Sequence, residues 1–377
     1  MDFTFDDEQQ LLCTGLTRFL ATRYDLEKSR AAVTSGAGWQ PEIWRAFAQE
    51  LGILGALLPE DCGGIGGGPV EMMLICEALG HALAVEPYVD TAVVAAGLLR
   101  RAGGSTAAAL LDGIVSGTTV VTVAATEPTS GEHWQDVSTV AECEGDGWVL
   151  TGTKIVSVST PLADSVLVTA RTSGARADSD GVSLFVVDIT SDPDGLQMHH
   201  YRTIDDRYAS DITMTRVRAT LLGEEGRAWP SLSRARDEGA AAVCAEAVGA
   251  MRKVLADTVD YAKQRTQFGQ PIGSFQVLQH RMVDMYMELE QAAAAVHLAV
   301  LHLDDDDAAT RARAVSAAKA TVGRAARFVG QQAVQVHGGM GMTEELAIGH
   351  YFKRLTALQF EFGSTDFHVD RYAALTT

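Results

Sequence analysis

The sequence has few cysteines, few aromatic residues and no surplus of basic residues, and each shortage excludes a class of protein. Its 377 residues include 5 cysteines and 7% aromatic residues, and the formal net charge is −19. The cysteines form no C-x-x-C pair, so we expect neither a disulfide framework nor a zinc site but the thiols of a reducing cytoplasm. Because nucleic acids and anionic membranes both require a basic surface, the negative charge excludes them as partners.

Two kinds of hydrophobic segment are also missing. The N-terminus is acidic and lacks the basic and apolar regions of a signal peptide. No apolar run is long enough to span a bilayer, so no membrane insertion is expected and a cytoplasmic location follows. Apolar residues nevertheless make up 47% of the chain, which is enough for a large core divided among two or three subdomains.

The spacing of apolar residues changes twice along the chain. Residues 1–119 follow a helical period, residues 120–225 contain short alternating segments, and residues 226–377 return to an alanine-rich helical pattern. This order predicts an α+β protein with an N-terminal helical domain, a middle antiparallel β domain and a C-terminal helical bundle. The expected strands are 120–125, 149–158, 165–170, 182–188 and 211–219, with a hairpin turn at 145–147. The expected helices include 8–24, 70–84, 91–101, 245–263 and 281–303, and one that begins at Pro41.

Two polar patterns have simple structural interpretations. The glycine-rich stretch 63–68 lacks the G-x-G-x-x-G register and a preceding strand, so it predicts a loop between helices, not a Rossmann-type dinucleotide site. His280, Asp284 and Glu288 have helical i, i+4 spacing, but without a further ligand cluster they predict a hydrated helix face and no metal site. The acidic run 304–307 predicts a cap for a helix that starts near Ala308.

The most informative segment is residues 265–280, RTQFGQPIGSFQVLQH. Glycine and proline interrupt a helical pattern here, which predicts a tight reversal between two long helices. Arg265 and Gln276 then lie at the two ends of the reversal, with Phe268 between them. A cation and an amide held at a turn can bind a phosphorylated cofactor while aromatic rings pack its flat parts. The alternative is an ordinary helical hairpin with a surface arginine.

A second segment, residues 335–344 (QVHGGMGMTE), follows a long helical pattern. Gly338 and Gly339 allow backbone N–H groups to approach a pyrophosphate closely, and Gln335 lies one turn earlier. The same glycines also suit a helix C-cap, and the two roles are compatible. A third segment, TEPTSG at 126–131, ends an expected strand. A threonine hydroxyl at a strand end can bond the edge of a flavin ring, and the alternative is ordinary turn chemistry.

Together these segments resemble the motifs of the acyl-CoA dehydrogenases, flavoenzymes that oxidise acyl-CoA thioesters. The opening FTFDDEQQLL and the LPEDCGG at 58–64 fit the same pattern, so the resemblance covers almost the whole chain. It is strongest to the small subunits of heteromeric bacterial enzymes of the pimeloyl-CoA dehydrogenase type. The resemblance implies an acyl-CoA dehydrogenase fold, bound FAD between subdomains and across a subunit boundary, and an electron-transfer flavoprotein or similar acceptor.

The resemblance also implies which residues contact FAD. They are Thr126, Arg265, Phe268, Gln276, Gln335, Gly338, Gly339 and Thr365. We expect the 265–276 segment of one subunit and the 335–339 segment of its neighbour to share one cofactor. The β-domain half departs from the family pattern, because Glu132 and His133 replace the usual Ser-Asp. Val156 and Val158 stand near the positions where the family has an aromatic residue and a hydroxyl.

The catalytic base of the family is a glutamate at one of two positions, and neither carries a carboxylate here. The C-terminal position falls on Gly363, or on Ser364 with a one-residue slip, and the position on the long helix falls on Gly239. Glu361 and Glu238 lie nearby, but one residue of displacement on a helix turns a side chain by roughly 100°. The catalytic residue therefore stays unassigned, with Glu238 and Glu361 as weak candidates.

Three hypotheses follow. The first is one subunit of a heteromeric acyl-CoA dehydrogenase, an oxidoreductase acting on CH–CH groups, whose sister subunit supplies the base in a heterotetramer. The second is a self-sufficient homo-oligomer that uses Glu238 or Glu361. The third is a non-catalytic flavin-binding subunit. Dicarboxylic, steroid side-chain and branched acyl groups of fatty acid or steroid catabolism are all compatible with the sequence.

Overall fold

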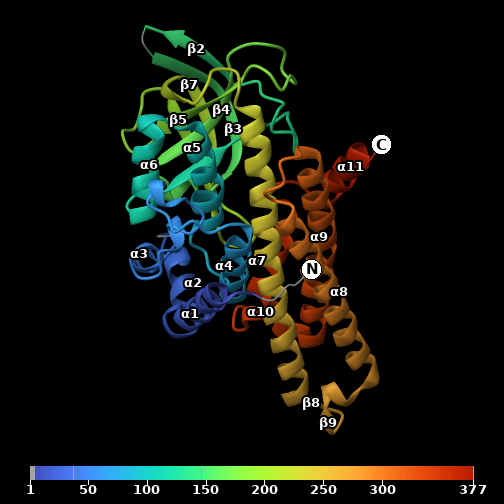
Figure 1. Cartoon of the computed structure of the whole chain (residues 1–377). Helices are drawn as coiled ribbons and strands as arrows, with labels where there is room; N and C mark the ends of the chain where they lie inside the picture. The colour runs from blue at the N-terminus through green and yellow to red at the C-terminus, as the bar shows by residue number, and fades with distance from the viewer. Residues whose placement is uncertain (1–4, 37, 146, 377) are drawn as a thin grey trace. The chain divides into compact units, whose positions relative to one another are not determined.

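The computed structural model describes residues 5–36, 38–145 and 147–376 and divides the chain into two compact units. One unit combines the N-terminal segment up to Glu27 with Pro69–Ala84 and Ala240–Thr377, and the other combines Lys28–Gly68 with Val85–Gly239. The boundary falls inside the long helix α7 (Trp229–Gln264) (Figure 1). Phe3 and Thr4 of the opening motif, and Asp146 of the expected hairpin turn, lie outside the described residues.

The unit built around Val85–Gly239 contains a sheet and several short helices. Within the described residues, seven strands form the sheet, with the order β1-β4-β2-β3-β7-β5 and β6 paired to β7. The strands are β1 (Val121–Ala124), β2 (Val140–Glu144), β3 (Gly147–Val158), β4 (Ser165–Arg171), β5 (Val182–Asp188), β6 (Leu196–Arg202) and β7 (Tyr208–Leu222). The helices are α2 (Leu26–Thr34), α3 (Pro41–Gln49), α5 (Ala96–Ala102) and α6 (Gly104–Ser116), the π-helix η3 (Val89–Ala95), and the 3₁₀ turns η1 (Ile53–Gly55), η2 (Glu60–Cys62) and η4 (Thr160–Leu162).

Most strand pairs are antiparallel, as the sequence predicts, but β4 runs parallel to both β1 and β2. The five expected strands are present, whereas β2 and β6 were not expected. Both have largely exposed side chains and lack the alternating apolar pattern that marks a half-buried strand. The inward faces of the sheet build one apolar core around Leu150, Val166, Phe185, Met214 and Val217.

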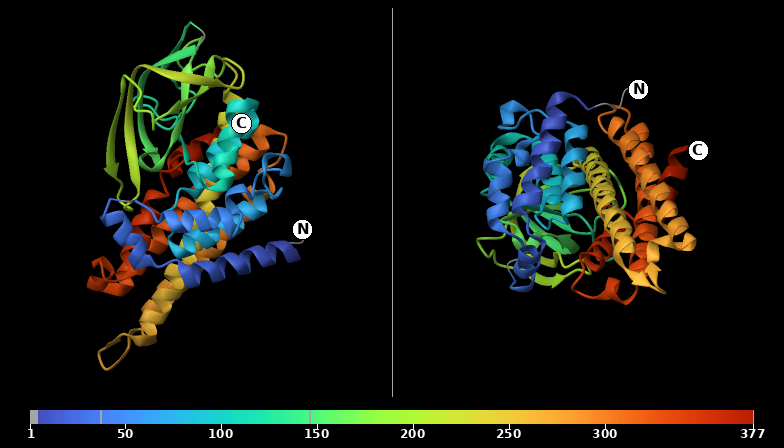
Figure 2. Two further views of the ribbon diagram at one scale, coloured as in Figure 1. Left: turned by 90° about the vertical axis from the view of Figure 1, so that its left-hand side faces the viewer. Right: turned by 90° about the horizontal axis from the view of Figure 1, so that it is seen from below.

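The other unit is helical. It contains α1 (Asp7–Arg23), α4 (Pro69–Ala82), most of α7, α8 (Gln276–Leu301), α9 (Ala308–His337), α10 (Ala347–Ala357) and α11 (Thr365–Thr376), with the 3₁₀ turns η5 (Ile272–Ser274) and η6 (Gly338–Met342). The short strands β8 (Thr266–Gln267) and β9 (Gln270–Pro271) form a hairpin where α7 ends and α8 begins (Figures 1 and 2). Asp307 caps α9 by accepting from the N–H groups of Ala309 and Thr310, which confirms the cap expected from the acidic run.

Glycines let α4 and α7 cross at very short range. A Cβ at Gly249 of α7 would overlap the carbonyl oxygen of Glu77 on α4, and a Cβ at Gly80 of α4 would overlap the carbonyl oxygen of Glu246 on α7. Because both obstacles are backbone atoms, neither can move aside by a rotamer change. The crossing therefore requires glycine at both positions.

We expect Gly249→Ala to lower the free energy of unfolding by about 1–3 kcal/mol or more, because the added methyl group forces two packed helices apart. Urea denaturation of the purified variant measures this loss. Gly15→Ala on α1 is the matched control, since a Cβ there meets nothing within 4 Å. That change should stabilise the protein by about 0.5–1 kcal/mol. Equal stability of the two variants would contradict the close crossing.

Candidate cofactor and active site

The hairpin between α7 and α8 exposes an aromatic ring at its tip. Phe268 and Gly269 both have left-handed backbones, with φ of +54° and +81°, as a two-residue hairpin turn requires. This conformation is unfavourable for a bulky residue such as phenylalanine. The Phe268 ring is 93% exposed and touches Phe275 edge to face, with 6.1 Å between the ring centroids. A strained, exposed ring of this kind is a typical contact for a ligand or another subunit.

Arg265 combines a fixed backbone with an available side chain. Its N–H donates to Tyr261 and its carbonyl accepts from Ile272, each at 2.8 Å. The side chain is exposed, and among the described residues no carboxylate lies within ion-pairing distance of its guanidinium. Gln276 is the exposed first residue of α8. The hairpin thus presents a cation and an amide at its base.

The glycine-rich end of α9 lies beside this hairpin in the same chain. Tyr261 stacks on His337 with 4.2 Å between ring centroids, and Ala262, Ile272 and Val336 share a small buried cluster. The next residue, Gly338, caps α9 through its N–H to the carbonyl of Gln335. Six of the eight expected cofactor residues therefore come together at one end of the helical unit: Arg265, Phe268, Gln276, Gln335, Gly338 and Gly339.

The glycines at this site differ in why they are needed. Gly338 has φ +60° and ψ −140°, a backbone conformation that only glycine adopts readily. Gly339 is not left-handed, and a Cβ on either residue would meet nothing within 4 Å. Because the protein itself gives Gly339 no reason to lack a side chain, the open space in front of it fits a ligand that approaches the backbone closely, such as a pyrophosphate.

Thr126 belongs to the other unit, where it precedes a buried carboxylate. The Thr126 carbonyl accepts from Ile155 at 2.9 Å, and Glu127 is 1% exposed. Glu127 accepts from Lys154 Nζ at 2.6 Å and from the N–H and hydroxyl groups of Ser138 and Thr139.

Burial by itself raises the pKa of Glu127, but Lys154 and the two hydroxyls outweigh it and hold the pKa at about 2. Burial lowers the pKa of Lys154 to about 8, although Glu127 opposes the shift. This pair fixes the loop that follows Thr126 and was not expected from the sequence. The only sequence signal is a lysine inside a β-branched strand, a position where a charge needs a partner.

Val156 marks the departure from the family pattern in β3. It has φ +52°, an uncommon conformation for a β-branched residue, and its side chain is half-exposed. Its N–H donates to Asp211, which also accepts from the Tyr201 hydroxyl. A bulge between Lys154 and Ser157 accompanies the turn. Val158 is partly buried, so neither valine supplies an aromatic ring or a hydroxyl to a ligand.

Both weak candidates for the base are held by arginines. Glu238 accepts two hydrogen bonds from Arg101, at 2.9 and 3.0 Å, and a third from Arg234 at 3.0 Å. Glu361 binds the buried Arg354, which also forms a bidentate pair with Glu246 at 2.7 and 2.8 Å. A carboxylate tied up in this way is a structural anion and is poorly placed to remove a proton from a substrate.

The family position of the C-terminal base is closed to side chains. Gly363 has φ +117°, and a Cβ there would lie 2.7 Å from both His368 Nε2 and Phe367 Cδ1. Ser364 instead accepts a hydrogen bond from the N–H of Phe367. A glutamate cannot be added at 363 without rebuilding this turn, so restoring the base at that position is not expected to work.

Comparison with known proteins identifies the family. Models of the acyl-CoA dehydrogenase N-terminal, middle and C-terminal domains match residues 6–118, 122–217 and 226–375. The chain belongs to the acyl-CoA dehydrogenase family. It is an oxidoreductase acting on CH–CH groups, with FAD as cofactor, and the predicted fold class is confirmed.

Three relatives illustrate the similarity. The acyl-CoA dehydrogenase IpdE2 of Mycolicibacterium smegmatis is 27% identical over 92% of both chains. The structure of the Tcur3481–Tcur3483 steroid ACAD, in a variant form, is 29% identical, covers 98% of both chains and superposes with a TM-score of 0.88. The FAD complex of PigA is 25% identical, covers 99% of this chain and 98% of its own, and has a TM-score of 0.90.

The residues at the hairpin fit the family's cofactor. An exposed cation, an amide and glycine backbone facing open space form a donor set suited to a diphosphate. In the described part of the chain, no helix is long and apolar enough to cross a membrane. The same residues contain no group of three histidine, cysteine or acidic side chains that could hold a metal ion.

Proposed function

We propose that the chain is one subunit of a heteromeric acyl-CoA dehydrogenase, of the pimeloyl-CoA dehydrogenase small-subunit type, and that a sister subunit supplies the catalytic base. The observation that carries the proposal is the absence of an available carboxylate at either family position. Glu238 and Glu361 are neutralised by arginines, and the turn at Gly363 excludes a side chain. The deciding measurement is turnover of this chain with and without a sister subunit.

The chemistry explains why a base is indispensable. α,β-Dehydrogenation removes a proton from the carbon next to the thioester carbonyl while a hydride leaves the β carbon. Bound FAD supplies the hydride acceptor. The described contacts leave this chain with roles in holding the cofactor and shaping the site, and we assign proton removal to the partner. In a self-sufficient enzyme, Glu238 or Glu361 would first have to break its hydrogen bonds to at least one arginine.

The cofactor cradle follows from the hairpin and the end of α9. We assign Arg265 to the FAD diphosphate, and Gln276, Gln335, Gly338 and Gly339 to hydrogen bonds around it. Tyr261 stacks on His337, so each chain carries the two segments side by side. We propose that the 335–339 segment of a neighbouring subunit completes the cofactor site built on the 265–276 segment. We also propose Thr126, which belongs to the other unit, and Thr365 as contacts of FAD. Thr365 packs near Gly323. Gly323 precedes His337 on α9 by a distance of about 21 Å along the helix axis, at 1.5 Å per residue.

Arg265→Ala is expected to weaken FAD retention roughly 10- to 150-fold, because a charge-assisted hydrogen bond to phosphate is worth about 1.5–3 kcal/mol. Flavin absorbance after extensive dilution and dialysis measures the loss. The control is Lys263→Ala in the last turn of α7, which removes a cation that pairs with Asp260 at 3.1 Å. This variant should retain FAD. Unchanged flavin content in Arg265→Ala would count against the cradle.

Exposed apolar side chains support association with another subunit. Val283, Met287, Leu298 and Leu301 lie along one face of α8 and are each about half exposed. On the opposite face of α8, Met285, Leu289, Val296 and Val300 are buried inside the unit. We propose that a sister chain covers the exposed face and that Phe268 reaches across the interface.

The relatives suggest the substrate class and the electron acceptor. The similar structure that covers 98% of this chain is described as the Tcur3481–Tcur3483 steroid ACAD, so its description includes two protein names and the word steroid. A relative from Acetobacterium woodii, 28% identical over 92% of both chains, is the CarC subunit of a caffeyl-CoA reductase–Etf complex. We therefore propose an acyl-CoA thioester with a bulky acyl group, such as a steroid side chain, as substrate, and an electron-transfer flavoprotein as acceptor.

A further inference from the structure

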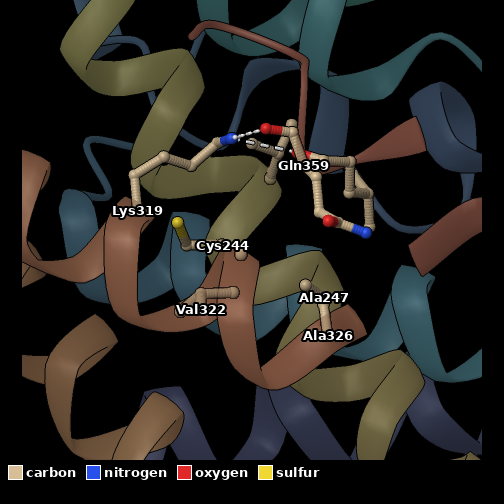
Figure 3. Close-up of a pocket in the computed structure, with 9 residues that line it drawn as sticks. Cys244, Ala247, Lys319, Val322, Ala326 and Gln359 are labelled. Atoms are coloured by element: carbon tan, nitrogen blue, oxygen red, sulfur yellow. Dashed lines mark hydrogen bonds between the residues drawn. The ribbon is translucent and has the colours of Figure 1, made fainter. Parts of the chain in front are cut away.

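Lys319 of α9 is a buried cation that donates hydrogen bonds to three backbone carbonyls. The side chain is 2% exposed, and Nζ donates to the carbonyl oxygens of Gly363 at 2.8 Å, Leu358 at 3.0 Å and Gln359 at 3.1 Å. Figure 3 shows the ammonium reaching the backbone of the 358–359 turn above a narrow pocket that Cys244 also lines. Burial raises the pKa of the Cys244 thiol to about 12, so the pocket holds no thiolate nucleophile.

The segment that Lys319 gathers is held from its other side as well. Arg354 binds Glu361, and the Phe362 carbonyl accepts from His368 Nε2 at 3.1 Å. Phe362 and Gly363 are both left-handed, with φ of +58° and +117°. Two consecutive left-handed residues, one of them a phenylalanine, persist only when their surroundings fix them. The ammonium acts here as a tethered monovalent cation at the centre of the turn.

Gly323 faces the same segment one helical turn after Lys319. Residues at i and i+4 share a helix face, so both positions lie against 358–365. A Cβ at Gly323 would overlap the Thr365 hydroxyl, which lies at the start of α11. The methyl group of an alanine would therefore drive the Thr365 hydroxyl into another rotamer, while the absence of a side chain leaves it in place.

We propose that Lys319 and Gly323 are positioning residues for the cofactor site: they set segment 358–365, and through it the Thr365 hydroxyl, without contacting FAD themselves. The proposal rests on the proposed function, because Thr365 is assigned to FAD there. It assigns a role to a buried lysine that the dehydrogenation chemistry does not itself use. It also predicts that a free ammonium ion can replace the side chain.

The first test is chemical rescue of Lys319→Ala. We expect faster amide hydrogen exchange across 358–365 and about tenfold weaker FAD binding, equal to about 1.4 kcal/mol. Propylammonium, which matches the deleted atoms, should reverse both effects. Tetramethylammonium at equal ionic strength should reverse neither, because it has no N–H to donate. Unchanged exchange in the variant, or equal rescue by both cations, would overturn the proposed role of Lys319. Lys253→Ala is the control, since its ammonium pairs with Asp257 on the protein surface.

A double-mutant cycle tests Gly323 independently and remains informative if Lys319→Ala fails to fold. Gly323→Ala should weaken FAD binding about tenfold in the wild type and add nothing in a Thr365→Val background. Full additivity would show that Gly323 does not act through the Thr365 hydroxyl. If the chain bound no FAD at all, the proposed function would fail. Hydrogen exchange with propylammonium would still test whether Lys319 fixes segment 358–365.

Discussion

The isolated, FAD-loaded chain is expected to oxidise acyl-CoA thioesters about 10²- to 10⁴-fold more slowly than its complex with a carboxylate-bearing sister subunit. This is the usual loss when a positioned general base is missing. The physical reason is that Glu238 is bound by Arg101 and Arg234, while Glu361 is bound by Arg354. The assay uses an artificial electron acceptor and a panel of dicarboxylic, branched and steroid side-chain thioesters.

Variants separate the three hypotheses about this chain. Vigorous turnover by the chain alone that disappears in Glu361→Gln or Glu238→Gln would identify that residue as the base and reject the partner. Bound flavin without turnover, even with the sister subunit present, would indicate a non-catalytic flavin subunit. Gly363→Glu should not restore activity to the isolated chain, because the new side chain would collide with Phe367 and His368. Light scattering of the active sample should report a particle larger than the 40.1 kDa chain.

Lys154→Met should lower the free energy of unfolding by about 3–5 kcal/mol, the second large effect we expect. The change leaves the Glu127 carboxylate buried without its cation, and an uncompensated buried charge is far more costly than the loss of an exposed ion pair. Thr169, which accepts from Lys154 at 2.9 Å, also loses its donor. Urea denaturation at neutral pH measures the effect.

Two comparisons show that burial causes the loss. Lys263→Met breaks an exposed pair with Asp260 and should cost less than about 1 kcal/mol. The double variant Glu127→Gln, Lys154→Met should lose less free energy of unfolding than the two single variants lose together, because each single change already breaks the same ion pair. An additive double variant would argue against direct coupling of the pair.

The same pair predicts how stability depends on pH. The pKa of Glu127 is about 2 in the folded chain, below its ordinary value of 4.5. A carboxyl with a lowered pKa stabilises the fold fully above the ordinary value, and the contribution is lost as pH falls from about 4.5 through about 2. Lys154→Met should flatten this part of the stability profile, since the cation that lowers the pKa is gone.

The sequence alone was sufficient for the fold class and for the two segments that we propose as the cofactor cradle. Local signals determine these features: Gly269 and Pro271 force the reversal after α7, and the run that ends at Gly338 closes α9. Strands with buried, β-branched faces were also predictable, whereas β2 and β6 carry exposed polar side chains and gave no signal. The domain boundaries at 119/120 and 225/226 stay predictions.

Only the tertiary structure decided the state of the charged groups. Nothing local relates Glu127 to Lys154, Arg101 to Glu238 or Lys319 to the carbonyl of Gly363, since 27 to 137 residues separate these partners along the chain. Their pairing depends on which elements pack together, and the free energy of a buried charge depends on its neighbours in space. The sequence therefore determined that the expected base is missing from this chain, while the packing of arginines around the two nearby glutamates decided that neither stands ready to replace it.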